Sequence, residues 1–265
     1  MKTERIITLT TDFGLKDGYA GAVKGAILSI NPGASIVDIS HDISPHDILE
    51  GAFVLYQSYS FFPPGTVHVA VVDPGVGGKR MPVLIKTERY IFIGPDNGIF
   101  SMALRNEAPK RHFSLTKGEY LIKEISSTFH GRDIFAPVAA QLSLGEEPSC
   151  LGEEIKDIRK VEWADPVLKG NRLEGIILHI DRFGNLITNI SRDDLLSFSQ
   201  GGAVKIRIGE MVITGLSKTY SDGGTGRPVA LISSLNLLEI AFYMESAQKM
   251  IRTERLKPLI VERVL

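Results

Sequence analysis

The residues best suited to chemistry follow an apolar run in the first half of the chain. Residues 68–72 (HVAVV) predict a buried strand, and the run ends on the carboxylate of Asp73. In an open α/β sheet, ligands bind beyond the carboxyl ends of the strands, so Asp73 would stand where a substrate binds. The next residues, 74–80 (PGVGGKR), carry three glycines and end on Arg80, whose guanidinium can hold a carboxylate in a fixed orientation. The alternative is a plain turn that Asp73 caps.

Three other loops of the first half also carry polar residues. Asp12 and Asp17 follow a β-branched run, residues 41–47 (HDISPHD) follow a second expected strand, and residues 127–133 (STFHGRD) precede a helix. Polar groups on several loops at one edge of a sheet can converge on a single crevice, which would make these loops one site. Each loop also has a purely structural interpretation, as a turn aspartate, a solvated loop or a helix cap.

The histidines of residues 41–47 raise the question of a metal. Four residues separate His41 from His46, a spacing that falls on a loop rather than on one face of a helix. We therefore expect no metal and no other cofactor. A metal-dependent hydrolase that uses His41, His46 and Asp73 is a weaker hypothesis.

Two nucleotide-binding interpretations fail, one on the spacing of its residues and the other because its companion motifs are missing. Residues 75–79 (GVGGK) lack the spacing of a phosphate-binding loop, and Arg80 follows the lysine where serine or threonine is required. Residues 12–14 (DFG) match the magnesium motif of kinases, but no glycine-rich loop or His-Arg-Asp loop accompanies them. Neither nucleoside triphosphate hydrolysis nor kinase activity is expected.

Composition narrows the class of protein. The 265 residues are 43% hydrophobic and 23% charged, with a formal net charge of −1, as in an ordinary globular protein. This balance indicates neither a nucleic acid nor a membrane as partner. Cys150 is the single cysteine and cannot form an intrachain disulfide. Because no stretch approaches the ~18 consecutive apolar residues of a membrane span, and the apolar run near the N-terminus is too short for a signal peptide, we expect a cytoplasmic protein.

The first half of the chain alternates short strands with helices. This alternation is typical of parallel strands joined by crossover helices, followed here by a hairpin and two further helices. The expected strands are residues 6–11, 35–39, 66–72, 83–86 and 90–94, and the expected helices are residues 19–30, 47–59, 99–104 and 134–144.

The second half changes character and predicts several short strands. Residues 146–165 are charged, show little periodicity and are interpreted as a linker. Beyond them, closely spaced strands with glycine turns indicate a small antiparallel barrel or sandwich. We expect an α/β N-terminal domain with a mostly parallel sheet (1–165, including the linker from about 146) and a small antiparallel all-β, barrel-like C-terminal domain (166–265). The expected strands are residues 172–180, 185–190, 204–208, 212–214, 229–232 and 258–261, with a possible helix within 235–250.

Five motifs in order give the chain a family resemblance. Each motif alone is weak, but together they span nearly the whole sequence. The motifs are residues 11–14 (TDFG) with Asp17, 72–77 (VDPGVG) with Arg80, 94–98 (GPDNG), 128–133 (TFHGRD) and 181–189 (DRFGNLITN). The chain resembles the S-adenosyl-L-methionine hydroxide adenosyltransferases, which hydrolyse that substrate and are relatives of the fluorinase and the chlorinase.

The resemblance implies a reaction and an assembly. The family's Asp–Arg–His triad falls on Asp73, Arg80 and His130. It implies hydrolysis of S-adenosyl-L-methionine to adenosine and L-methionine without a metal. It also implies a homotrimer whose active sites lie between subunits.

The resemblance also implies substrate contacts from the first domain. It places Asp12 on the two ribose hydroxyls, Asp17 near the methionine part and Phe129 among the substrate-binding residues. His46 stands where the halogenases stack an aromatic residue on the substrate.

Further contacts are implied from the β domain of a neighbouring subunit. Asp181 and Asn185 would bind polar groups of the substrate, Phe183 would stack near adenine, and Ser234 would hold the methionine carboxylate. Asn236 departs from the family's usual glycine, although asparagine tolerates a left-handed conformation, so the turn can survive. The halogenases' arginine in this segment is also absent.

The chemistry of the substrate agrees with a water nucleophile. Methionine leaves C5′ as a neutral thioether, so the enzyme need only hold a water in line and remove its proton. Asp73 and His130 can each accept that proton, and the sequence leaves open which of them is the base and which sulfonium epimer is preferred. A halide would be repelled by an unpaired Asp73 carboxylate, and Gly131 replaces a serine that helps to hold the halide. The alternatives are a non-catalytic adenosine or S-adenosyl-L-methionine binding protein and, third, a halogenase.

Overall fold

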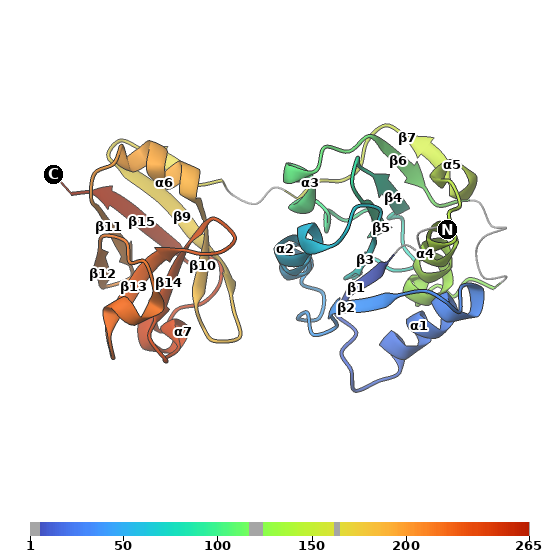
Figure 1. Ribbon diagram of the computed structural model, residues 1–265, viewed down its shortest axis with the longest axis horizontal. Helices are drawn as coiled ribbons and strands as arrows, with labels where there is room; N and C mark the ends of the chain where they lie inside the picture. Colours follow the sequence, from blue (N-terminus) through green and yellow to red (C-terminus); the bar gives the residue numbers. More distant parts are fainter. Residues whose placement is uncertain (1–5, 117–123, 162–164, 265) are drawn as a thin grey trace. The chain divides into compact units, whose positions relative to one another are not determined.

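The computed structural model describes residues 6–116, 124–161 and 165–264. Contacts between residues divide the chain into two compact units, Met1–Glu162 and Trp163–Leu265, which are described separately (Figure 1). Among the described residues, no helix combines the length and the apolarity needed to cross a membrane.

The first unit is built on one sheet of mixed direction. The strand order is β2-β1-β3-β5-β4-β6-β7, with parallel pairing from β2 to β5 and antiparallel pairing from β5 to β7. The register aligns the last residues of β1 and β3, Thr11 and Val71. The strands are β1 (Ile7–Thr11), β2 (Ile36–Ser40), β3 (Val67–Val71), β4 (Pro82–Lys86), β5 (Ile91–Pro95), β6 (Arg111–Ser114) and β7 (Glu153–Ile155).

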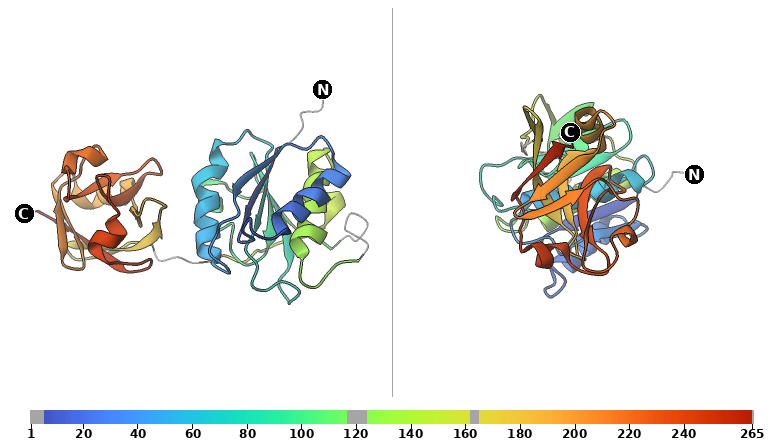
Figure 2. Two further views of the ribbon diagram at one scale, coloured as in Figure 1. Left: turned by 90° about the horizontal axis from the view of Figure 1, so that it is seen from below. Right: turned by 90° about the vertical axis from the view of Figure 1, so that its left-hand side faces the viewer.

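Helices cover both faces of this sheet, which explains its apolar central strands. Helices α1 (Tyr19–Ile30) and α4 (Ala136–Ser143) lie on one face, and α2 (Ile48–Ser58) lies on the other (Figure 2). Every residue of β1 and β3 is buried, as in strands covered on both sides. The expected α/β domain with a mostly parallel sheet is confirmed.

Four elements of the first unit differ from the sequence prediction. The segment from 146, interpreted as a linker, contains the short helix α5 (Pro148–Leu151) and the edge strand β7. The residues of β7 are largely exposed, and a charged edge strand has the composition of a linker. Strand β6 was not predicted, and helix α3 (Ala103–Asn106) begins later than the expected 99–104.

The second unit is antiparallel throughout, and its curved sheet forms a nearly closed barrel (Figure 1). The expected barrel-like β domain is confirmed. Strand order is β12-β11-β15-β9-β10-β14-β13, and β8 pairs with β9. The strands are β8 (Val167–Lys169), β9 (Arg172–Ile180), β10 (Leu186–Ser191), β11 (Val204–Ile208), β12 (Met211–Thr214), β13 (Pro228–Ile232), β14 (Leu237–Phe242) and β15 (Pro258–Arg263).

Two α-helices and the turn at Asn236 can also be compared with the sequence prediction for this unit. Helix α6 (Arg192–Ser199), which was not predicted, starts at a capping box in which Ser191 and Asp194 bond reciprocally. Much of the possible helix within 235–250 is strand β14, and only α7 (Ala247–Ile251) is helical. Asn236 adopts a φ of 59°, so the prediction that asparagine preserves this left-handed turn is confirmed.

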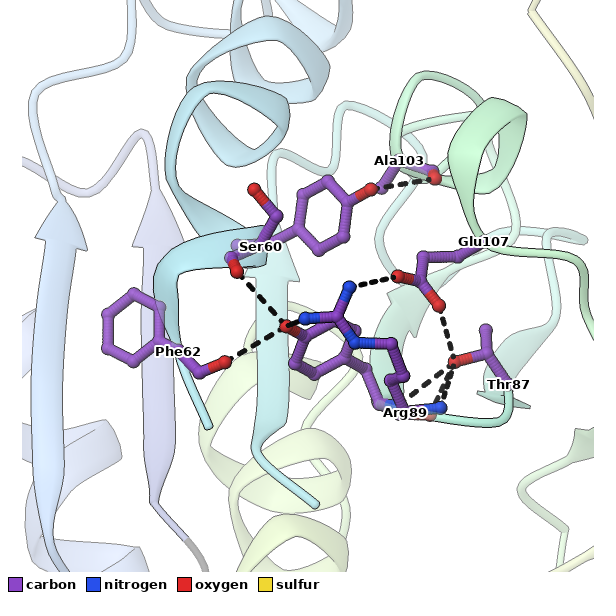
Figure 3. Close-up of polar contacts among 8 residues, drawn as sticks. Ser60, Phe62, Thr87, Arg89, Ala103 and Glu107 are labelled. Carbon is purple, nitrogen blue, oxygen red and sulfur yellow. Dashed lines mark hydrogen bonds and ion pairs between the residues drawn. The ribbon is translucent and has the colours of Figure 1, made fainter. Parts of the chain in front are cut away.

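A buried tyrosine joins the segment after α2 to the β4–β5 hairpin (Figure 3). The Tyr90 side chain is 1% exposed, and its hydroxyl contacts the carbonyl oxygens of Ser60 (3.2 Å) and Phe62 (2.9 Å). The same oxygen accepts a bond of 2.8 Å from the Arg89 guanidinium. The nearby hydroxyl of Tyr59 makes a long contact of 3.4 Å with the carbonyl of Ala103 and a further bond with the Asn106 side chain.

We predict that Tyr90→Phe destabilises the first unit by about 1–2 kcal/mol, because it leaves partly buried carbonyl groups without their donor. Tyr59→Phe is the matched control and should cost less, since the carbonyl that it leaves without a donor, that of Ala103, accepts only a long and weak bond. Urea unfolding followed by circular dichroism measures both. Equal losses in the two variants would contradict this account of the cluster.

Candidate active site

Asp73, Arg80 and His130 lie in direct contact. The Arg80 Nε atom is 3.0 Å from each carboxylate oxygen of Asp73, and its Nη2 atom donates to Oδ2 of the same carboxylate. Nη2 also donates to Nδ1 of His130 at 2.7 Å. The side chains of Arg80 and Asp73 are only 7% and 6% exposed. The structure therefore brings these three predicted residues together around one guanidinium.

The glycine loop makes this contact possible. Asp73 lies just beyond the end of β3, and the loop that follows returns Arg80 to its side. Gly77 has a φ of 73°, and a Cβ atom there would lie 2.1 Å from the carbonyl oxygen of Ser127. Any other residue would push the loop away from the segment that carries His130.

The contact with Arg80 fixes the hydrogen-bonding role of His130. A guanidinium can only donate, so Nδ1 of His130 must accept, and a neutral imidazole then carries its proton on Nε2. Burial lowers the pKa of His130, and the positive charge of Arg80 lowers it further, while Asp73 opposes the shift. His130 is therefore a neutral N–H donor at pH 7.

A cavity of about 280 Å³ opens beside this group. Its lining includes Asp73 and His130, together with Asp12, His46 and Phe129. One carboxylate oxygen of Asp12 accepts a bond of 2.9 Å from the backbone N–H of His46. The predicted residues Asp12, Asp73, Phe129 and His130 thus share one cavity.

Three aromatic rings form an apolar wall of the cavity. Phe13, Tyr19 and Phe129 pack with ring centroids 5.3–6.2 Å apart. A Cβ atom at Gly131 would lie 3.1 Å from the Phe13 ring. Phe13 and Tyr19 were not predicted as lining residues, although Phe13 belongs to the first motif and Tyr19 follows Asp17 by two residues. Asp17 itself is exposed and does not line this cavity.

The three residues of the metal hypothesis, His41, His46 and Asp73, do not lie together at one site. His41 is 4% exposed, and its Nδ1 atom is 2.7 Å from the hydroxyl of Thr11, while His46 and Asp73 line the cavity. Over the described ranges, the structure shows no group of three or more histidine, cysteine, aspartate or glutamate side chains placed to hold a metal ion.

A second cavity, of about 580 Å³, lies on the C-terminal unit. It is lined by three of the predicted residues, Asp181, Phe183 and Asn185. The Asp181 carboxylate accepts bonds of 2.8–2.9 Å from the backbone N–H groups of Phe183 and Asn185 and from the Asn185 side chain. Gly184, with a φ of 84°, completes this turn and leaves the Phe183 side chain 78% exposed.

Ser234 lies apart from these residues, and one further residue joins them. Ser234 is in the turn between β13 and β14, whereas the cavity lies at the opposite end of β14. Tyr220 also lines the cavity and donates a bond of 2.9 Å to the buried carboxylate of Glu239, whose pKa is raised by burial. No motif in the sequence pointed to Tyr220, which begins the short 3-10 helix Tyr220–Gly223, far from Asp181 along the chain.

Comparisons with known proteins identify the family. The model of the SAM hydroxide adenosyltransferase N-terminal domain matches residues 7–152, and the model of the C-terminal domain matches residues 175–259. The chain therefore belongs to the SAM hydroxide adenosyltransferase family, and the predicted resemblance is confirmed.

Individual relatives agree with this assignment. The chain is 38% identical to an (R)-S-adenosyl-L-methionine hydrolase of Methanocaldococcus jannaschii, over 95% of this chain and 93% of that protein. It is 30% identical to a fluorinase of an Actinoplanes species, over 89% and 90% of the two chains. A crystal structure of an uncharacterized conserved protein from Thermotoga maritima is similar, with a TM-score of 0.92 and 33% identity over 97% of this chain and all of that one.

We predict that burial keeps the pKa of His130 below the usual histidine value of 6.5 and that Arg80→Gln raises this pKa, because the substitution removes the positive charge that lowers it and leaves the charge of Asp73 that raises it. Since the folded chain binds this proton less readily than the unfolded chain, acidification through this range destabilises the fold. NMR titration of histidine-labelled protein measures the shift. His68, which is buried away from Arg80 and has a pKa lowered to about 3, is the control. A pKa of His130 that is the same in both proteins would contradict the assigned contact.

Proposed function

We propose that this protein hydrolyses S-adenosyl-L-methionine to adenosine and L-methionine. The observation that carries the proposal is the buried Asp73–Arg80–His130 group beside a cavity that Asp12 also lines. Membership of the family and the names of the hydrolase relatives support it. Those names specify the (R) sulfonium epimer, and we propose the same preference here.

The proposed reaction is a single displacement at C5′. The oxygen of a water forms a bond to C5′ while the C5′–sulfur bond breaks, and its electron pair stays on sulfur, which leaves as the neutral thioether of methionine. The water loses one proton to the Asp73 carboxylate. Arg80 keeps that carboxylate oriented until attack.

His130 has a different proposed role from Asp73. Its Nδ1 atom is occupied by Arg80, so it acts through Nε2–H as a donor that holds the oxygen of the attacking water. With this role for His130, Asp73 is the proposed base.

Water rather than halide is the proposed nucleophile, despite the fluorinase relatives. A halide brought beside Asp73 would meet a carboxylate in a site with little solvent, and the repulsion would oppose binding. Arg80 is already bonded to that carboxylate and to His130, so its charge is shared with both.

The proposed substrate contacts divide between the two domains, 1–165 and 166–265. In the first domain, Asp12 binds the ribose hydroxyls, Phe129 packs on the substrate and Asp17 lies near the methionine part. From the second domain of a neighbouring subunit in a homotrimer, Asp181, Phe183 and Asn185 bind the nucleoside and amino-acid groups, and Ser234 the carboxylate. The cavity shared by Asp181, Phe183 and Asn185 supports this proposal for three of the four.

We predict that the purified protein releases adenosine and L-methionine and that Asp73→Asn lowers kcat by about 10²–10⁴-fold, as expected for the loss of a general base. Chromatography of both products from each resolved epimer measures turnover, and adenosine binding by calorimetry shows whether the variant keeps its site. The absence of product from neutral to alkaline pH would refute the hydrolase. Tight binding without turnover in the unaltered protein would instead support the binding-protein alternative.

We predict that two inactive variants complement each other when they are assembled together. Asp73→Asn damages the first domain, and the double variant Phe183→Ala, Asn185→Ala damages the second. If each site combines two subunits, random mixed trimers regain about one quarter of the intact sites. Sedimentation should give three times the 29.1 kDa of one chain. No recovery of activity in mixed assemblies would place both sets of residues in the same subunit.

A further inference from the structure

We propose that His41 is a positioning residue for the candidate active site. It joins the turn that carries Asp12 to the loop that carries His46, and so fixes the Asp12 carboxylate at the cavity. The inference rests on the proposed function in one respect, namely that Asp12 binds the ribose. His41 does not itself line the cavity.

The side chain of His41 bonds to the end of the strand that precedes Asp12. Its Nδ1 atom lies 2.7 Å from the hydroxyl of Thr11, the last residue of β1, and both residues are buried. The Thr11 hydroxyl also accepts a bond of 3.2 Å from the backbone N–H of Phe13. The same hydroxyl therefore joins His41 to the backbone on the far side of Asp12.

Backbone bonds join the same two segments around this side-chain contact. The N–H of Gly14 donates to the carbonyl of His41 at 2.7 Å, and the N–H of Ile43 donates to the carbonyl of Thr11 at 3.4 Å. We call these contacts, together with the Thr11–His41 bond, the loop clasp.

The loop clasp positions a bond made to Asp12 itself. At the end of the second loop, His46 has a φ of 69°, and its N–H donates to Oδ2 of Asp12 at 2.9 Å. The carboxylate is held through one oxygen and can present the other to the cavity. A left-handed conformation is costly for a residue other than glycine, so it persists only where neighbouring contacts hold it.

The other ring nitrogen of His41 contributes less. Nε2 is 3.1 Å from an oxygen of Asp38 but makes no well-aligned hydrogen bond with it. Asp38 is 38% exposed and also pairs with Lys24 at 2.6 Å, so solvent and the Lys24 ammonium group screen its charge. The Thr11 side of His41 is therefore the one that should control Asp12.

The chain contains a matched pair for this contact elsewhere on β1. Thr8 bonds to Nδ1 of His68 at 2.8 Å, and both residues are buried in the same sheet. This pair resembles the Thr11–His41 pair in chemistry and in burial, but neither residue lines the cavity. It separates an effect on Asp12 from a general loss of stability.

The test compares Thr11→Val with Thr8→Val, and His41→Asn with His41→Gln. Asparagine can place an amide near Nδ1 and keep the bond to Thr11, whereas glutamine reaches toward Nε2 and loses it. We expect Thr11→Val and His41→Gln to raise KM for S-adenosyl-L-methionine about tenfold while kcat changes less than about threefold, as for the loss of uniform binding. We expect His41→Asn and Thr8→Val to keep a near-normal KM, although Thr8→Val lowers the Tm as Thr11→Val does.

Calorimetry with adenosine provides a readout that needs no turnover. The dissociation constant of adenosine should rise in Thr11→Val and His41→Gln in parallel with KM. Equal KM values in Thr11→Val and Thr8→Val, or a fall in kcat at constant KM, would overturn the positioning role. An unaltered protein that lacks hydrolysis refutes the proposed function instead, and normal adenosine binding by Thr11→Val would then refute this inference separately.

Discussion

The candidate site depends on one guanidinium that serves two acceptors. Arg80 donates to both oxygens of Asp73 and to Nδ1 of His130, so a single side chain sets the orientation of the carboxylate and the tautomer of the imidazole. A lysine could not replace it, because an ammonium group lacks the planar fork that matches a carboxylate. The glycine loop, the close approach at Ser127 and the burial of the pair all serve to bring this group to one place.

Much of this arrangement could be predicted from the sequence, because buried parallel strands are recognisable as β-branched, apolar runs. The β-branched runs that became β1 and β3 are buried on both faces, and their ends mark the edge where Asp12 and Asp73 stand. The edge strand β7 was hidden because charged, exposed strands resemble linkers. Strand β14 was partly taken for a helix because a short apolar run suits either element when no turn residue interrupts it.

Side-chain roles were less accessible to sequence than side-chain identity. The family motifs named His130, but only the contact with Arg80 determines which ring nitrogen accepts. Phe13 and Tyr19 line the cavity together with Phe129, on which their rings pack, and periodicity does not reveal this contact between distant segments of the chain. Ser234 and Asp181 both lie in loops, but these loops are at opposite ends of β14. The sequence does not reveal this separation, because it depends on how the antiparallel strands pair.

The register between β1 and β3 has a consequence for how such a site can diversify. Because Thr11 pairs with Val71, the carboxylates of Asp12 and Asp73 follow adjacent strands. The spacing of about 4.8 Å between paired strands therefore sets how far apart their attachment points lie. Losing one residue inside either strand would turn every following side chain to the opposite face. Loops beyond the strands can change length without changing that spacing between the strands. Changes in the loops can therefore alter which substrate fits while the sheet keeps the two carboxylates in place.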